Sequence, residues 1–439
     1  MIRIVPTAKN RIYYGWHIVA IAFFAHFMAI GSGFYVLNAF MQPLCELRNW
    51  SRTDINLALA FGMGFGFVGQ FLYGTLVIRT GPRVLMSIGP IVGGIAFILL
   101  MRTQVLWQFY LLYVFLFLGN GAYSGIVAST AVNNWFVLHR GRALGTATAG
   151  MSLSGAILPI VAMILILKSG LAGASLWIGI MIMSVAPLAW FVVRDWPEDH
   201  GLFPDGLPPG KNIPFTRNAD ERPQDQDCAV NSGQFVTPAR NMGPLWDLPS
   251  LIRTGAFWKL GLSFALILIG VVGVMSQLKP RFADIGFSDM TAMGMMAATA
   301  LFGTAGKYFW GMIADRFDPK RVVFVLALAN SLGLAMAFFQ GSLLALVLFV
   351  MIFGFSMGGI MSTYPIIVAD FFGRESFPAV LRFVSLFLLL QLTGYAIAGQ
   401  SFDRTGSYDS AYMVFIFLDL VAAFLVIFIR KPKLDLARG

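Results

Sequence analysis

Apolar runs of about twenty residues alternate with short polar turns along almost the whole of this 439-residue sequence. A run of that length forms a helix that can cross a hydrocarbon core of about 30 Å. Backbone groups in lipid must bond within their own segment, and runs rich in Leu, Ala, Met and Gly favour helices over barrel strands. The pattern predicts an all-α membrane protein with twelve transmembrane helices, at residues 13–43, 55–77, 84–102, 107–135, 141–167, 172–193, 256–279, 290–314, 322–340, 343–372, 378–402 and 409–430.

A polar segment, residues 195–253, separates the first six predicted spans from the last six. It is dense in Pro, Gly, Asp, Arg and Asn and cannot bury enough apolar surface to form a span. We therefore expect an N-terminal six-helix bundle at residues 1–194, a cytoplasmic linker at 195–253 and a C-terminal six-helix bundle at 254–439.

The two halves repeat one another at the level of sequence. A shift of about 237 residues superposes similar residues in both halves. The matched pairs are Pro43 with Pro280, Trp50 with Phe287, Ser51 with Ser288, Gly69 with Gly306, Gly74 with Gly311, Arg79 with Arg316 and Arg83 with Lys320. Six spans in each half make the repeat parallel, so we expect two pseudo-symmetric bundles with a binding site between them near the midplane.

The composition indicates membrane embedding rather than a soluble core. Hydrophobic residues make up 58% of the chain and charged residues only 12%, which is more apolar side chain than one soluble core can hide. The net charge of +10 follows from topology, because Lys and Arg favour the side of both termini by about three to one. We expect a multi-pass protein of the plasma (inner) membrane with both termini in the cytoplasm, and no nucleic-acid binding.

The sequence offers no catalytic or metal-binding pattern. Cys45 and Cys228 form neither a disulfide framework nor a metal-ligand spacing, and no G-x-x-x-x-G-K-[ST] loop is present. Glycine clusters such as Gly62, Gly64 and Gly66 are typical of close helix packing. We expect a monomeric protein that is not an enzyme and holds no metal and no cofactor, with the lipid bilayer and a solute as its partners.

Related loops follow spans 2 and 8. They read Gly74-Thr-Leu-Val-Ile-Arg79-Thr-Gly81-Pro-Arg83 and Gly311-Met-Ile-Ala-Asp315-Arg316-Phe-Asp-Pro-Lys320-Arg321. Glycine allows two helices to approach closely, while basic residues at helix ends can pair with acids on neighbouring spans. A tight turn with cytoplasmic charge would explain each Arg but not their repetition.

The two loops resemble the loop signature of the major facilitator superfamily. This resemblance extends over nearly the whole chain and implies a fold of two six-helix bundles. It also implies gating roles for the charged loop residues Arg79, Arg83, Asp315, Arg316 and Lys320. In the first loop Ile78 occupies the position of the usual Asp. The gating network that this acid would anchor is therefore expected to rest on the second loop.

More specific motifs lie at the entrances and ends of the spans. They are Tyr14-Gly15-Trp16, Trp50-Ser51-Arg52, Asn134-Trp135-Phe136, Arg140-Gly141-Arg142-Ala143-Leu144-Gly145, the segment that begins with Arg194-Asp-Trp-Pro-Glu-Asp-His, and Phe309-Trp310-Gly311. Together they resemble the branch of monocarboxylate porters and oxalate:formate antiporters. The resemblance implies a secondary active or facilitative transporter of small organic anions that works by alternating access.

The chain departs from this branch at three places. Animal porters carry an acid where this chain has Gly303, and a lysine where it has Phe34 or Tyr35. The oxalate exchanger carries a second midplane lysine in the region that here comprises residues 385–391. One fixed cation suits a monoanion better than a dianion, so we expect a monocarboxylate. The resemblance does not say which ion, if any, is co- or counter-transported.

Lys307 is the central candidate for substrate binding. It lies eight residues before Asp315, or about 12 Å along a helix, which places it near the middle of the bilayer. A cation there is costly and normally faces a polar cavity and has a partner. In the branch that this chain resembles, a basic side chain at this position binds the substrate carboxylate, and the repeat places Gln70 opposite it. The alternatives are a salt bridge, with Asp419 as the only comparably buried acid, and snorkelling to a helix end.

Other polar groups lie on helices that commonly line such a pathway. Besides Lys307 and Gln70, the substrate-binding candidates are Asn120, Tyr123, Tyr35, Tyr364, Gln391 and Tyr395. Each could equally make an ordinary hydrogen bond between helices. His26 and Asp419 are the candidates for proton coupling. A neutral histidine bonded to backbone and a neutral carboxyl facing a neighbouring helix are the simpler interpretations.

Two other classes of function stay open at this point. An exporter of larger apolar or cationic compounds would be expected to have an acidic cavity, and the sequence offers only Asp419 for it. A membrane sensor that does not transport would signal through the linker or a terminus, yet the linker contains no evident folded module.

Overall fold

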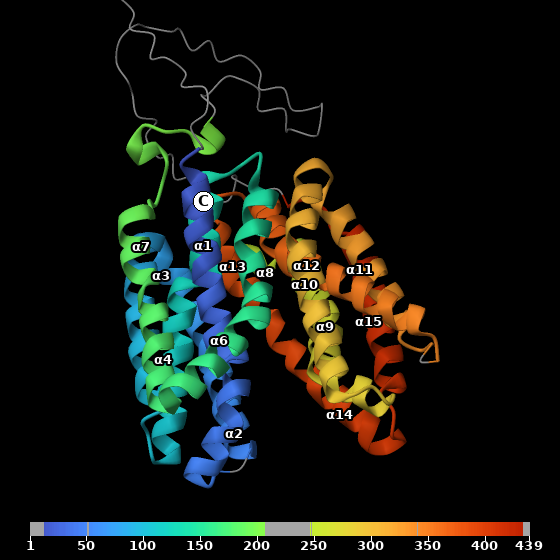
Figure 1. Ribbon diagram of the computed structural model, residues 1–439. Coiled ribbons are helices and arrows are strands. Elements are labelled where there is room, and N and C mark those ends of the chain that lie inside the picture. The colour runs from blue at the N-terminus through green and yellow to red at the C-terminus, as the bar shows by residue number, and fades with distance from the viewer. Residues whose placement is uncertain (1–12, 51, 207–245, 247, 340, 433–439) are drawn as a thin grey trace, which may run out of the picture.

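The computed structural model describes residues 13–50, 52–206, 246, 248–339 and 341–432, and within these ranges helices are joined only by turns and short loops (Figure 1). Both chain ends lie outside the described part. So do residues 207–245 and 247 of the expected linker, Cys228 among them. The helices form two bundles, as the sequence predicts.

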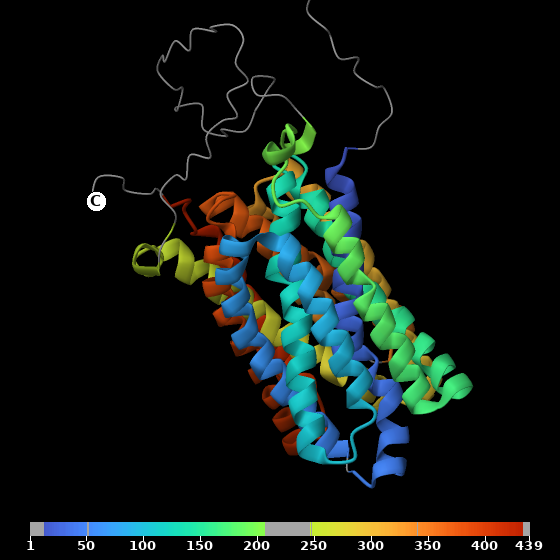
Figure 2. The same ribbon diagram turned by 90° about the vertical axis from the view of Figure 1, so that its left-hand side faces the viewer.

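Six spans form the first bundle. They are built, in order, from α1 (Gly15–Ile30) with the π-helical turn η1 (Gly31–Tyr35) and α2 (Leu37–Arg48), α3 (Arg52–Leu100), α4 (Leu106–Tyr123) with α5 (Ile126–Trp135), and α6 (Arg140–Met183) with α7 (Val185–Val192). The chain turns back within α3 at Gly81 and within α6 at Gly170, so each holds two spans (Figure 2). Both glycines have positive φ angles, of 78° and 68°, which a residue without Cβ adopts at little cost.

The second bundle also has six spans. They follow the short α8 (Leu248–Ile252) and comprise α9 (Gly255–Asp284), α10 (Asp289–Arg316), α11 (Pro319–Met336), α12 (Leu343–Phe372), α13 (Phe377–Val384) with the 3-10 segment η4 (Ser385–Leu392) and α14 (Thr393–Thr405), and α15 (Asp409–Ile427). Two 3-10 turns, η2 (Glu198–His200) and η3 (Pro204–Gly206), lie in the described start of the linker.

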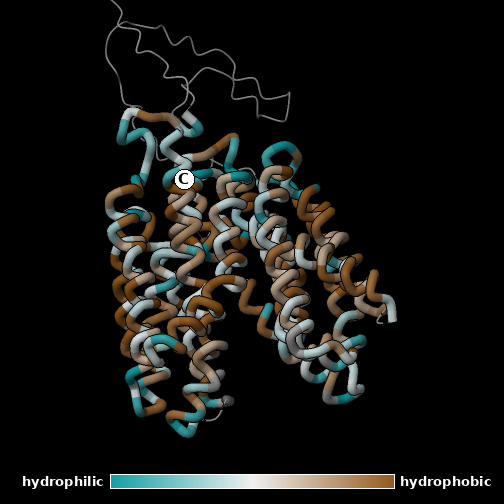
Figure 3. Tube along the Cα trace, in the orientation of Figure 1, coloured by the Kyte–Doolittle hydropathy of each residue, from teal (hydrophilic) through white to brown (hydrophobic). Residues whose placement is uncertain are grey.

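The outer surface suits a membrane. Within the described residues, nine helical stretches are long and apolar enough to cross a bilayer. Two of them contain the turns at Gly81 and Gly170 and hold two spans each, and α10 completes the predicted twelve. Large apolar side chains such as Leu167 and Phe191 are 80% and 72% exposed. Figure 3 shows apolar residues along the sides of both bundles and polar residues gathered at their ends, as lipid requires.

Two predicted spans are less regular than expected. Span 4, predicted as one helix over 107–135, is interrupted at Ser124 and Gly125. Span 11, predicted over 378–402, contains η4 in its middle. Hydrophobic periodicity does not show such interruptions, because the residues on both sides of them are equally apolar.

The bundles lie together at the end that carries the linker and diverge toward the opposite end (Figure 1). Near the linker end α6 packs directly on α10. A Cβ on Gly145 would overlap the carbonyl of Lys307, and one on Gly311 would overlap the carbonyl of Gly141. Small residues thus bring the two backbones into contact, in agreement with the packing role expected for the loop glycine.

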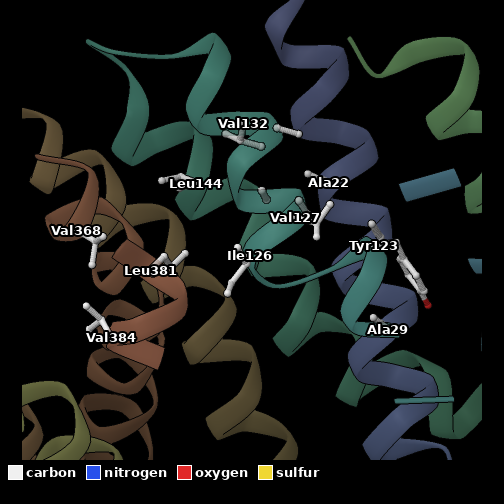
Figure 4. Close-up of a cluster of buried hydrophobic side chains, with 14 of the residues drawn as sticks. Ala22, Ala29, Tyr123, Ile126, Val127, Val132, Leu144, Val368, Leu381 and Val384 are labelled. Carbon is white, nitrogen blue, oxygen red and sulfur yellow. The ribbon is translucent and has the colours of Figure 1, made fainter. Parts of the chain in front are cut away.

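A buried apolar layer accompanies this contact. Ile126 and Leu144 of the first bundle and Leu381 and Val384 of the second belong to one cluster of buried side chains (Figure 4). The rings of Phe71 and Phe383 extend the contact across the bundles with centroids 5.5 Å apart. Packing of this kind closes the linker end and leaves a cavity deeper between the bundles.

Candidate functional site

A cavity of about 410 Å³ lies between the two bundles. Six of the eight predicted substrate-binding residues line it, namely Lys307, Gln70, Asn120, Tyr35, Gln391 and Tyr395. Much of the remaining wall is apolar and includes Met63, Met151, Met275, Met357 and Met361. The cavity therefore combines a few polar groups with a flexible apolar surface, as is common in small-molecule sites.

Lys307 is buried in this cavity wall, with 3% of its surface exposed. Its Nζ donates a hydrogen bond to Ser152 Oγ on α6, at 2.8 Å. The bond crosses from the second bundle to the first. Within the described residues no carboxylate lies at ion-pair distance from this ammonium group. The cation thus has one neutral partner and an open cavity beside it.

Asp419, the alternative partner of Lys307, is engaged elsewhere. Asn330 Nδ2 donates to Asp419 Oδ2 at 2.7 Å, and Ser356 Oγ donates to Asn330 Oδ1 at 3.2 Å. These residues join α15, α11 and α12 within the second bundle, and none of them is among the cavity-lining residues. The salt bridge between Lys307 and Asp419 is therefore not formed.

Asn120 is held in a fixed orientation on the wall of the first bundle. Its Nδ2 donates to Ala29 O at 2.9 Å, and its Oδ1 accepts a hydrogen bond from the Tyr123 hydroxyl, also at 2.9 Å. Tyr123 does not line the cavity. It supports Asn120 from behind the cavity wall, and its predicted contact with substrate stays a prediction.

His26 also lies behind the cavity wall and is fully buried. Its Nδ1 is 2.7 Å from Ser124 Oγ, and Ser124 lines the cavity. The simpler interpretation of the sequence is a histidine bonded to backbone, whereas the structure pairs His26 with the side chain of Ser124. Ser124 thus connects His26 with the cavity.

The interruption of span 4 lies in the cavity wall. Ser124 is extended and Gly125 has φ 54°, after which α5 begins without a side-chain cap. Both residues line the cavity, and a Cβ on Gly125 would meet no atom within 4 Å. The first turn of α5, with its positive dipole end, therefore starts beside the cavity.

On the other side of the cavity, Gln391 lies in η4 and Tyr395 in α14. Tyr364 is not among the lining residues. Its hydroxyl lies 3.1 Å from Ser385 Oγ, and its ring packs against Phe264 inside the second bundle. The structure thus places Tyr364 inside the second bundle with its hydroxyl group paired, and its predicted contact with substrate stays a prediction.

The charged loops have unequal roles. Asp315 accepts hydrogen bonds from the amides of Gly141 and of Arg142, the latter at 2.9 Å, and so caps the first turn of α6 across the bundle boundary. Arg83 stays within the first bundle, where its Nε donates to Trp190 O at 2.9 Å. Arg79 lines a smaller pocket of about 210 Å³ at the linker end.

The remaining two gating candidates are placed differently. Arg316 is exposed at the end of α10. The amide of Lys320 binds Asp318 Oδ1 at 3.1 Å, at the start of α11. Arg316 and Lys320 thus lie at the linker end. Asp315, in contrast, bonds to the other bundle.

Sequence reasoning missed several residues at these sites. Ser152 pairs with Lys307 only through the contact between the bundles, and no local signal identifies it. Gly125 had a signal, because a Ser-Gly pair stands in the middle of an apolar span. Arg374 and Arg382 were counted only as cytoplasmic charge. Arg382 donates to Thr75 Oγ1 of the first bundle, and Arg374 forms an ion pair with Glu198 of the linker at 2.8 Å.

Within the described residues, twelve spans form two bundles around a central cavity, an arrangement typical of membrane transporters that move a solute between two bundles. The sequence model of the Major Facilitator Superfamily matches residues 19–303 and 260–438, and the chain belongs to this family. Its relatives and fold neighbours are transporters, not enzymes.

Relatives differ in what their names say they carry. The oxalate:formate antiporter of Oxalobacter formigenes is 24% identical over 68% of this chain and 64% of its own length. Monocarboxylate transporter 12 of Mus musculus is 25% identical over 70% of this chain and 63% of its length. The agnestins efflux protein of Paecilomyces divaricatus is 24% identical over 86% of this chain and 79% of its length.

A solved structure shares the fold. The transporter FucP in the outward conformation covers 94% of this chain and 98% of its own, with a TM-score of 0.71 and 14% sequence identity. The comparison supports the two-bundle architecture that the sequence predicts.

Proposed function

We propose that this protein carries a small organic anion, most suitably a monocarboxylate, with Lys307 binding the carboxylate. The single observation behind the proposal is that a buried ammonium group, 3% exposed, faces a cavity with only a serine hydroxyl as its partner. A cation in such a place is costly unless a counter-charge reaches it. A carboxylate entering the cavity would supply that charge.

The other walls of the cavity agree with a small monoanion. Lys307 is the only basic residue among its lining residues, and a single cation matches a single carboxylate. The amide groups of Gln70 and Gln391 offer neutral hydrogen bonds, and the methionine side chains suit an apolar substrate body. The uncapped start of α5 adds a second region of positive potential.

Transport would follow from rocking of the two bundles about the cavity. Besides the bond between Lys307 and Ser152 at the cavity, several described hydrogen bonds and an ion pair join the bundles at the linker end, so this state is closed there. The Lys and Arg distribution favours a cytoplasmic position for that end, and with this orientation the state is outward-facing. If a proton accompanies the anion, His26 is the better candidate, because Ser124 connects it with the cavity whereas Asp419 lies away from it.

The test is uptake of labelled carboxylates by proteoliposomes. Lys307→Gln should reduce uptake at least tenfold, because the carboxylate loses its only cation, while the Lys307→Arg variant should keep part of the activity. The matched control is Lys259→Gln, since Lys259 donates to Phe428 O at 3.1 Å and does not line the cavity. Undiminished uptake by Lys307→Gln would contradict the proposal.

A substrate screen would narrow the choice of acid. Thermal unfolding of the purified protein with about fifty carboxylates should show stabilisation by monocarboxylates that disappears in Lys307→Gln, since a ligand stabilises only the state that it binds. Stabilisation that survives the substitution would show that Lys307 does not bind the ligand.

A second candidate function is efflux of larger compounds. It is favoured by the relative named for agnestins efflux, which aligns with 86% of this chain, and by the apolar part of the cavity wall. Counterflow with labelled neutral compounds separates the two candidates. An exporter of neutral compounds should work equally well with Gln at position 307, and a protein that only senses a ligand should show no counterflow.

A further inference from the structure

Residues 194–206 lead from the first bundle into the described start of the linker and form a strap across the linker end of that bundle. Its first residues are fixed there by three hydrogen bonds. Arg194 O accepts from Trp135 Nε1 at 2.8 Å, Asp195 O accepts from Asn134 Nδ2 at 2.9 Å, and Asp195 Oδ1 accepts from the amide of Arg83 at 3.0 Å.

The far end of the strap is fixed to the same bundle. Asp205, whose side chain is 2% exposed, accepts hydrogen bonds from the amides of Val137 and Leu138 at 2.8 Å and from that of His139 at 3.1 Å. Three backbone amides around one carboxylate make a rigid anchor. With both ends fixed in this way, the strap must move together with the first bundle.

The middle of the strap reaches the second bundle. Glu198 binds Arg374 in a two-pronged ion pair with distances of 2.8 and 3.2 Å. The guanidinium group also lies 4.7 Å from the ring centroid of Trp196 and donates to Asn134 O. Arg374 stands in the turn between α12 and α13, so its pair with Glu198 crosses from one bundle to the other.

The repeat allows the contact on this side of the gate to be compared with its counterpart on the other side. In the second loop Asp315 caps the amides of Gly141 and Arg142 across the boundary. The shift of about 237 residues makes Ile78 the counterpart of Asp315, and Pro378, the second residue of α13, has the place of Gly141, the second residue of α6. Ile78 has no carboxylate and Pro378 has no amide hydrogen, so the matching contact cannot form.

The two substituted positions lie close to the bridge. Ile78 and Pro378 line the same pocket of about 210 Å³, and Arg374 lines it too. α13, which begins at this point, has no side-chain cap. The acid-to-amide contact is thus absent from one side of the pseudo-symmetric gate, and the ion pair between strap and second bundle stands beside the gap.

We propose that the strap replaces this missing contact and is the second half of the gate that holds the linker end closed. Glu198 moves with the first bundle and Arg374 with the second. Their ion pair must therefore break whenever the bundles separate at the linker end. A strap that only tied the linker to the protein would leave the balance between closed and open states unchanged.

The experiment measures that balance in the full-length protein in nanodiscs. Spin labels are placed at Phe191→Cys and Phe428→Cys, exposed ends of the two bundles, in a background with Cys45→Ser and Cys228→Ser. Glu198→Gln should raise the ratio of separated to closed distances about threefold, as expected for loss of a partly exposed ion pair. No substrate is present, so the outcome does not depend on the proposed role of Lys307.

Matched variants test whether a change in the distances comes from the ion pair between Glu198 and Arg374. Asp199→Asn removes the neighbouring strap acid, which has no described ion pair, and should leave the distances unchanged. Asp205→Asn releases the far anchor and should act like Glu198→Gln. The pair Ile78→Asp with Pro378→Ala rebuilds the acid and the amide, and should return the Glu198→Gln protein toward the closed state. An unchanged distribution in Glu198→Gln, or failure of the rebuilt pair to restore closure, would overturn the proposal.

Discussion

The hydrogen bond between Lys307 and Ser152 joins the two bundles at the proposed substrate site. It fixes a buried ammonium group with one neutral acceptor. A buried donor that loses its partner costs about 1–3 kcal/mol, and more when it is charged. On the proposed function, an arriving carboxylate would compete with Ser152 for the ammonium group that joins the bundles.

This competition predicts the effect of Ser152→Ala. Without the hydroxyl, the empty protein should melt at a lower temperature, because the ammonium group is left unpaired. A bound carboxylate should then raise the melting temperature by more than it does in the unchanged protein. Thermal unfolding with and without the preferred acid measures both quantities.

The control for this prediction is Ser154→Ala on the same helix. Ser154 Oγ donates to Met151 O at 2.7 Å and does not touch Lys307. Its loss should leave the ligand-induced shift as it was. An equal gain in both variants would mean that the hydroxyl of Ser152 has no special relation to Lys307.

At the scale of elements, the interruption of span 4 is the feature that most changes the site. It exposes Ser124 to the cavity, brings His26 within one hydrogen bond of it and starts α5 at its wall. In a continuous helix, the same backbone groups would form hydrogen bonds within the helix. The interruption thus converts a helix interior into part of a binding surface.

Gly125 is the residue on which this interruption depends. Its φ of 54° with ψ of −118° is strained for any residue with a Cβ, although a methyl group would meet no neighbour. Gly125→Ala should therefore lower the free energy of unfolding by about 1–3 kcal/mol through backbone strain alone. Thermal or denaturant unfolding in detergent measures the loss.

Gly64→Ala provides the comparison. Gly64 lies inside α3, and a Cβ there would also meet no atom within 4 Å. Alanine in a helix interior should stabilise by up to about 1 kcal/mol. Equal effects of the two substitutions would show that the backbone of Gly125 is not strained.

The sequence predicts the elements better than their contacts. Span lengths, the parallel repeat and Lys307 follow from apolar run length, spacing and the cost of a midplane cation, all of which are local properties. The partner of Lys307 is Ser152, 155 positions away, and it is set by how α6 packs on α10. Tyr123 and Tyr364 are residues of a type that can line a cavity. Their positions around the helix axis, however, place their side chains behind the cavity wall.

At the scale of the whole molecule, orientation in the membrane decides what the closed linker end means. The charge bias predicts that Gln104, in the exposed turn between α3 and α4, faces the outside, and that Leu202 in the strap faces the cytoplasm. In the background without Cys45 and Cys228, a membrane-impermeant maleimide should label Gln104→Cys in whole cells. It should label Leu202→Cys only after the membrane is opened, and the reverse pattern would invert the topology.

The strap also makes the gate depend on the two bundles belonging to one chain. A symmetric pair of separate six-helix units would have no peptide between the units, so both of its gate contacts would have to be of the kind that Asp315 makes. A joined chain has one linker, and therefore one strap, on one side only. Ile78 and Pro378 stand on the side that the strap spans. On the proposed role of the strap, the joined chain supplies on that side a contact that two separate copies could not form.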